Sequence, residues 1–279
     1  MGNKHRVVLI TGASSGIGKC CAEYLSHRGY RVYGTSRRAS DTDSPGSFQV
    51  SDTFTMIQMD VNDDDAVQEG IEYIIARESR LDVVVNNAGF GLAGALEDTS
   101  IKEVKFQFET NFFGVLRVCR AVLPIMRNQG SGYFVNISSI GGLVGLPFQS
   151  AYSASKFALE GATEALRSEV QPFGVKVVLI EPGDFRTEIT RHRMKTVQTT
   201  RDSVYSDTFQ RVLNIIETNE RNAPTPEQIA MLVFKIINTE SPRLRYTVGK
   251  FSQRIAAPAK KFLPWRWFES ILARNFHLK

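Results

Sequence analysis

Residues 6–18 read RVVLITGASSGIG, and this stretch decides the fold because a strand-like apolar run leads directly into a glycine-rich turn and a helix. The run RVVLI has the composition of a strand that is buried on both faces of a parallel sheet. Glycines at Gly12, Gly16 and Gly18 allow backbone N–H groups to approach a pyrophosphate, and the N-terminus of the following helix favours an anion. The alternative is a tight strand-to-helix turn that binds nothing.

The same alternation of strand and helix continues along the chain. Further apolar runs predict strands at 30–35, 54–59, 81–85, 132–137, 176–180 and 245–248. Segments with helical spacing lie between them, at 17–28, 63–77, 100–127, 153–171 and 226–238. This order predicts the α/β class, with a single doubly wound, Rossmann-type parallel sheet of about seven strands and helices on both faces. Residues 39–52 read as a polar loop, and residues 183–224 form a long mixed segment.

Composition limits the class of protein. Of the 279 residues, 42% are hydrophobic and 23% are charged, which excludes a disordered chain. The cysteines Cys20, Cys21 and Cys119 provide neither a disulfide framework nor a metal-binding spacing. The first apolar run is too short for a signal peptide, and no run reaches the roughly 18 residues of a membrane span. We therefore expect a cytoplasmic protein that binds no metal.

The end of the second predicted strand indicates which dinucleotide would bind. An acidic residue at this position accepts hydrogen bonds from the ribose 2′-hydroxyl of NAD, whereas a cation suits the 2′-phosphate of NADP. The sequence here is Ser36-Arg37-Arg38, with two guanidinium groups and no acid. This pattern favours NADP(H) over NAD(H). The alternative is that both arginines are only a solvated strand end.

The segment AYSASK (151–156) places Tyr152 and Lys156 four positions apart, on one face of a predicted helix. A tyrosine with a pKa of about 10 is a poor acid–base catalyst at neutral pH. A neighbouring ammonium group favours the phenolate and lowers that pKa. Tyr152 could then exchange a proton with a substrate oxygen while hydride moves to or from a nicotinamide.

Together these motifs resemble the short-chain dehydrogenase/reductase family, from about residue 6 to about residue 249. TGASSGIG resembles the cofactor loop of the family, and Asp60 in MDV matches its adenine contact. The signature NNAG corresponds to 86–89, and the proline–glycine turn to Pro182-Gly183 with Thr187 four residues beyond the glycine. Counting thirteen residues back from the tyrosine selects Ser139 rather than Ser138.

The resemblance implies a role for each matching residue. Tyr152 is the expected proton donor, Ser139 orients the substrate oxygen, and Lys156 contacts the nicotinamide ribose. Asn111 matches the family asparagine that holds a proton-relay water, although it could also be purely structural. The cofactor set that we predict is Gly12, Ser14, Ser15, Gly16, Ile17, Gly18, Arg37, Arg38, Asp60, Val61, Asn87, Ala88, Gly89, Tyr152, Lys156, Pro182, Gly183 and Thr187.

The apolar segment IGGLVGLPFQSA (140–151) adjoins the predicted reaction centre and favours a lipophilic carbonyl or alcohol. GGLVGLPF, YSASKFALEG and SPRLRYTVGK are similar to the hydroxysteroid and retinol dehydrogenase branch. We therefore expect an NADP-dependent enzyme of lipid metabolism. It would act on CH–OH donors or reduce steroid-like or retinoid-like carbonyls. Residues 183–224 would cover the substrate. The alternative is a non-catalytic NADP(H)-binding sensor or interaction protein with the same fold.

The tail has a different character from the rest of the chain. Residues 251–279 carry six basic residues and one acidic residue, which accounts for the whole net charge of +5. The neutral remainder disfavours nucleic-acid binding. We expect a domain at 1–250 and a C-terminal extension at 251–279 that contains an amphipathic helix. Its apolar stripe is Phe268, Ile271, Leu272 and Phe276.

Two placements of this helix remain open. It could pack on its own sheet, on a partner or over the substrate entrance. Alternatively, 262–279 could make a peripheral membrane contact through Trp265, Trp267 and the basic residues. The family resemblance further implies a homodimer or a homotetramer.

Overall fold

A computed structural model describes residues 5–37, 46–201 and 203–278 of the chain. The main sheet contains β1 (Val7–Ile10), β2 (Arg31–Ser36), β3 (Ser47–Ser51), β4 (Phe54–Gln58), β5 (Val83–Asn86), β7 (Gly132–Ile137), β8 (Val175–Pro182) and β10 (Arg245–Val248). A second, two-stranded sheet pairs β6 (Leu92–Ala93) with β9 (Met194–Lys195). The helices are α1 (Gly16–Ser26), α2 (Asp64–Glu78), α3 (Ile101–Phe108), α4 (Gly114–Gln129), α5 (Ser150–Val170), α6 (Ile189–His192), α7 (Val197–Arg201), α8 (Ser206–Arg221), α9 (Glu227–Ile237), α10 (Phe251–Phe262) and α11 (Trp265–Asn275).

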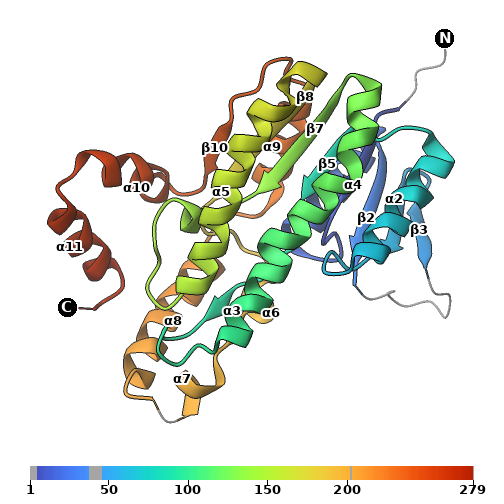
Figure 1. Cartoon of the computed structure of the whole chain (residues 1–279). Helices are drawn as coiled ribbons and strands as arrows, with labels where there is room; N and C mark the ends of the chain where they lie inside the picture. The colour runs from blue at the N-terminus through green and yellow to red at the C-terminus, as the bar shows by residue number, and fades with distance from the viewer. Residues whose placement is uncertain (1–4, 38–45, 202, 279) are drawn as a thin grey trace.

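The main sheet has eight strands in the order β10-β8-β7-β5-β1-β2-β4-β3. All neighbouring pairs are parallel except β3 and β4. Helices α2, α4 and α5 cover the face toward the viewer in Figure 1, and α1 and α9 pack together on the other. The α/β, doubly wound fold predicted from the sequence is confirmed.

Strand β1 shows why such runs are apolar without alternation. Val8 and Ile10 contribute to the core beneath α1 and α9. Val7 and Leu9 contribute to the core beneath α2, α4 and α5. Successive side chains of a strand point to opposite faces, so a strand with helices on both faces needs apolar residues at every position.

The strand order places a binding crevice at one edge of the sheet. Strand β1 lies between β2 and β5, and the chain moves outward in opposite directions from this point. Doubly wound folds bind ligands where the strand order reverses, outside the carboxyl ends of the strands. The motifs after β1, β5, β7 and β8 therefore meet at the same edge.

Three local features differ from the sequence expectations. Residues 47–51, within the expected polar loop, form the antiparallel edge strand β3, and Phe48 packs against the core. The expected helix over 100–127 is interrupted by a π-helical turn at Glu109–Phe113. The C-terminal segment forms two helices instead of one, and Pro264 precedes the second. None of the helices in the described part of the chain is long and apolar enough to cross a membrane.

Candidate active site

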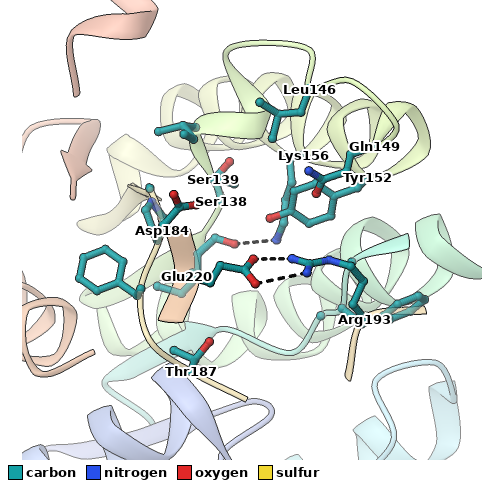
Figure 2. A pocket seen from close by; sticks show the side chains of 18 of the residues that line it. Ser138, Ser139, Leu146, Gln149, Tyr152, Lys156, Asp184, Thr187, Arg193 and Glu220 are labelled. Atoms are coloured by element: carbon teal, nitrogen blue, oxygen red, sulfur yellow. Dashed lines mark hydrogen bonds and ion pairs between the residues drawn. The ribbon is translucent and has the colours of Figure 1, made fainter. Parts of the chain in front are cut away.

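A cavity of about 1460 Å³ occupies the carboxyl edge of the sheet. It extends from the glycine-rich turn after β1 to the C-terminal helices α10 and α11. Figure 2 shows the part around Tyr152, where side chains from the turn after β7, from α5 and from the segment after β8 face one another. Within the described residues, no group of three or more His, Cys, Asp or Glu is arranged to hold a metal ion.

The glycine-rich turn requires glycine for two different reasons. Gly12 and Gly16 have φ angles of +67° and +55°, in the left-handed region that favours glycine. A Cβ atom at Gly18 would lie 2.3 Å from the carbonyl oxygen of Gly12 and 2.4 Å from Asn87 Nδ2. Asn87 fixes the turn by donating from Nδ2 to the carbonyls of Thr11 (2.9 Å) and Gly12 (3.1 Å). The turn is thus a rigid cradle whose backbone can approach a dinucleotide phosphate.

Most of the predicted cofactor residues line this one cavity. They are Gly12, Ser14, Ser15, Gly16, Ile17, Arg37, Val61, Asn87, Ala88, Gly89, Tyr152, Lys156, Pro182, Gly183 and Thr187. Gly18 instead supports the turn from behind, where only a hydrogen atom fits. Asp60 accepts a hydrogen bond from the backbone N–H of Asn62 at 3.0 Å and does not line the cavity. Arg38 lies outside the described residues.

Tyr152 and Lys156 lie in the first part of α5, and both are buried in the cavity wall, with 9% and 6% of their surface exposed. Lys156 donates from Nζ to the carbonyl of Ile137, at the end of β7, at 2.9 Å. Burial lowers the pKa of Lys156 to about 8. The helix therefore presents a phenol and an ammonium group of lowered pKa to the same part of the cavity.

Ser139 forms a hydrogen bond with the Tyr152 hydroxyl. Burial raises the pKa of Tyr152, and the hydrogen bond with Ser139 lowers it. The Ser139 Oγ also accepts the backbone N–H of Gly141 at 3.0 Å, which fixes its direction. Arg193 is the second group that lowers this pKa. The contribution expected from Lys156 stays a prediction.

Asn111 lies in the π-helical turn between α3 and α4 and is completely buried. Its Nδ2 donates to the carbonyl of Phe90 (3.0 Å) and to Ser155 Oγ (3.3 Å), and its Oδ1 accepts the N–H of Phe90 (3.1 Å). These contacts brace the loop after β5 against α5. Its role in a proton relay stays a prediction.

The sequence motifs did not indicate two residues of the candidate active site. Arg193 and Glu220 line the cavity and form a buried ion pair with contacts from both Nη atoms, and only 3% and 8% of their side chains are exposed. They lie 27 residues apart. Arg193 belongs to a basic stretch and Glu220 to an amphipathic helix, so both read as solvated residues. No sequence signal distinguishes such a pair from surface charges.

The C-terminal helices supply an apolar wall of the cavity. Phe268, Ile271, Leu272 and Phe276, which form the predicted stripe, all line it. Helix α10 is tied to the domain by Lys260, which donates from Nζ to the carbonyl of Leu143 at 2.9 Å. The apolar stripe therefore faces the same cavity as Tyr152.

Comparison with known proteins agrees with this geometry. The family model described as short chain dehydrogenase matches residues 6–198. The chain is 46% identical to 3-ketodihydrosphingosine reductase from Bacteroides thetaiotaomicron, over 93% of each protein. It is 35% identical to bovine (Bos taurus) retinol dehydrogenase 8, over 88% of this chain and 82% of that protein. A short-chain dehydrogenase structure from Streptomyces avermitilis superposes with a TM-score of 0.81 at 33% identity, covering 97% of this chain and 96% of that one.

The chain therefore belongs to the short-chain dehydrogenase/reductase family, as the sequence motifs indicate. It is an oxidoreductase that acts on CH–OH or carbonyl groups. Related structures have been solved with NADP bound.

Proposed function

We propose that this protein uses NADPH to reduce a lipophilic ketone to a secondary alcohol. The observation that carries the proposal is that the buried Tyr152 hydroxyl shares one cavity with the apolar stripe of α11. An apolar wall beside the reacting group favours a substrate with a hydrocarbon body. The 3-ketodihydrosphingosine reductase relative supports a long-chain keto compound, and 3-ketodihydrosphingosine is our candidate.

The dinucleotide fits the half of the cavity formed by the glycine-rich turn. Residues 12–17 would hold the pyrophosphate, residues 87–89 would contact the nucleoside, and residues 182–187 would cover the nicotinamide end. Arg37 is exposed at the cavity lining, where its guanidinium can bind a 2′-phosphate. When bound, NADPH supplies a hydride.

The side chains of α5 and of the turn after β7 would have separate roles in the reaction. Tyr152 donates its proton to the ketone oxygen, and Ser139 orients that oxygen through its own hydroxyl. Lys156, held by the carbonyl of Ile137, contacts the cofactor ribose and favours the phenolate that remains after proton donation. Burial of all three side chains keeps bulk water away from the transferring proton.

An assay that measures both cofactor consumption and alcohol formation tests the proposal. Purified protein is given NADPH or NADH with 3-ketodihydrosphingosine, a steroid ketone, retinal and a short water-soluble ketone, and the alcohol formed is identified by mass spectrometry. We expect NADPH consumption matched by alcohol from the long-chain ketone. Cofactor binding without turnover of any carbonyl or alcohol would instead favour the non-catalytic sensor.

We also propose that the outer surface of the C-terminal helices touches a membrane, from which a lipophilic substrate could be drawn. Phe262, Trp265 and Trp267 are 86%, 58% and 67% exposed, beside basic Lys261 and Arg266. Such residues settle at the interface of anionic bilayers. Co-sedimentation with anionic vesicles should weaken with salt and in W265S/W267S. Equal sedimentation of variant and wild type would contradict this contact.

We also propose that the protein assembles as a homodimer or a homotetramer, as the family implies. Light scattering during size-exclusion chromatography measures the mass directly. A mass of one 31.2 kDa chain at micromolar concentration would contradict it.

A further inference from the structure

The cavity wall beside Tyr152 carries charged side chains that a purely apolar substrate does not explain. Asp184 follows β8, Arg193 follows α6, and Glu220 lies near the end of α8. All three line the cavity, and we refer to them as the charged cluster. Figure 2 shows the side chains of the charged cluster and the Tyr152 phenol directed toward the same space. Burying charges in this position is costly, which suggests a function for them.

The guanidinium of Arg193 forms a buried ion pair with Glu220. Both Nη atoms bind Glu220, and its Nε is buried without a partner among the described residues. Arg193 therefore holds Glu220 in place, and the charge of Glu220 is balanced by this ion pair. Glu220 is fixed a second time by Thr190, whose hydroxyl donates to Oε2 at 2.7 Å.

The two carboxylates retain acceptor capacity. A carboxylate offers about four lone-pair sites. Glu220 uses them for Arg193 and Thr190, mostly at Oε2, and Asp184 accepts from Gln253 Nε2 at 2.6 Å. Burial raises the pKa of Asp184, and the nearby Glu220 raises it further, so the two carboxylates repel each other. The hydrogen bond from Gln253 lowers the pKa of Asp184, and so do the charges of Arg193 and of Lys250, which also lines the cavity.

We propose that Glu220 and Asp184 bind an ammonium group on the carbon next to the reacting carbonyl, so that the enzyme selects long-chain 2-amino ketones over simple ketones. Both carboxylates line the same cavity as Tyr152, whose hydroxyl protonates the ketone in the proposed reaction. A cation one carbon away from the carbonyl would lie between them and relieve their repulsion. The hydrocarbon chain would then extend along the stripe of α11. This inference rests on the proposed ketone reduction and adds its head-group specificity.

The test compares three ketones of the same chain length. They are 3-ketodihydrosphingosine, its neutral N-acetyl derivative, and 1-hydroxyoctadecan-3-one, which lacks the nitrogen. We expect kcat/KM to be greater for the amine than for either neutral ketone by about tenfold or more, the scale of one charge-assisted contact. Equal kcat/KM values for all three would overturn the inference and leave ketone reduction intact. Failure to reduce any of them would overturn the proposed function itself.

Variants locate the selectivity in the charged cluster. D184N and the double variant R193M/E220M remove carboxylates, and the double variant avoids leaving a buried unpaired charge. Because the two carboxylates together produce the wild-type ratio, each variant should reduce the amine-to-neutral ratio of kcat/KM by about threefold or more. The ratio within one variant cancels losses that affect both substrates equally. If the double variant fails to fold, D184N and the wild-type comparison still decide the question.

Helix α8 offers a matched control. Glu217 lies one turn before Glu220, pairs with Lys195 and does not line the cavity. The E217Q variant should keep the wild-type ratio. A ratio that falls equally in E217Q and D184N would show a general charge effect and contradict the assignment.

Discussion

The Ser139 hydroxyl forms the hydrogen bond that opposes the effect of burial on the Tyr152 pKa. Ser139 is itself fixed by the backbone N–H of Gly141, so this hydrogen bond is held before substrate arrives. The relationship makes the protonation of Tyr152 sensitive to a group thirteen residues earlier in the chain.

Replacing Ser139 with alanine should therefore raise the Tyr152 pKa. Alcohol oxidation with NADP⁺ requires the phenolate, so the rising limb of its pH–rate profile should move to higher pH. The rate at neutral pH should fall by about 100-fold. S138A is the matched control, because its hydroxyl has no hydrogen-bond partner among the described residues. A shift in S138A and not in S139A would reverse the choice between the two serines.

Lys156 should make stability depend on pH. Its pKa is about 8 in the folded protein against 10.5 when exposed, so the unfolded state binds more protons between these values. At neutral pH, burying the charged lysine lowers the free energy of unfolding by about 3 kcal/mol. The free energy of unfolding of the cofactor-free protein should then rise with pH across that window. K156M removes this cost and loses one hydrogen bond worth about 1 kcal/mol. We expect K156M to be more stable than wild type near pH 7, by about 2 kcal/mol.

Urea unfolding at several pH values from 7 to about 10.5 measures this difference. The stability gap between K156M and wild type should shrink as pH rises, because wild type gains stability and the variant does not. A gap that stays constant with pH would contradict the buried cation.

The choice of cofactor should depend on Arg37. R37D places a negative charge where a 2′-phosphate would bind, so the affinity for NADPH should fall relative to NADH by about 10- to 100-fold. Fluorescence titration with both cofactors measures the ratio. Arg120, exposed on α4 and outside the cavity, provides the control R120D. Equal affinities of the wild type for the two cofactors would contradict NADP preference.

Two glycines should respond in opposite ways to alanine. A Cβ atom at Gly18 would lie 2.3 Å from the carbonyl oxygen of Gly12, so G18A must distort the turn and weaken both stability and cofactor binding. Gly161 lies in α5, and its Cβ would meet nothing within 4 Å. G161A should stabilise the protein by up to about 1 kcal/mol. Thermal unfolding measures the Tm of both variants. A change in Tm of the same sign and size in G18A and G161A would contradict the prediction.

Local patterns made most of the fold and the reaction centre predictable. Two of these patterns lie within a few residues of sequence: the glycines at 12, 16 and 18, and the spacing of Tyr152 and Lys156. Strand β3 was missed because an edge strand can expose both faces and remain polar. The charged cluster was missed because Arg193 and Glu220 become partners only when α6 and α8 fold over the cavity. Sequence spacing carries no trace of that approach.

The most direct test of the central claim is turnover by wild type and by Y152F with NADPH and 3-ketodihydrosphingosine, alongside NADPH binding. Tyr152 supplies the proton, so Y152F should lose about 10²- to 10⁴-fold in kcat. Its affinity for NADPH should stay close to that of wild type, because the glycine-rich turn is untouched. Wild-type protein that binds NADPH without reducing the ketone, or Y152F that turns over as fast as wild type, would contradict the account.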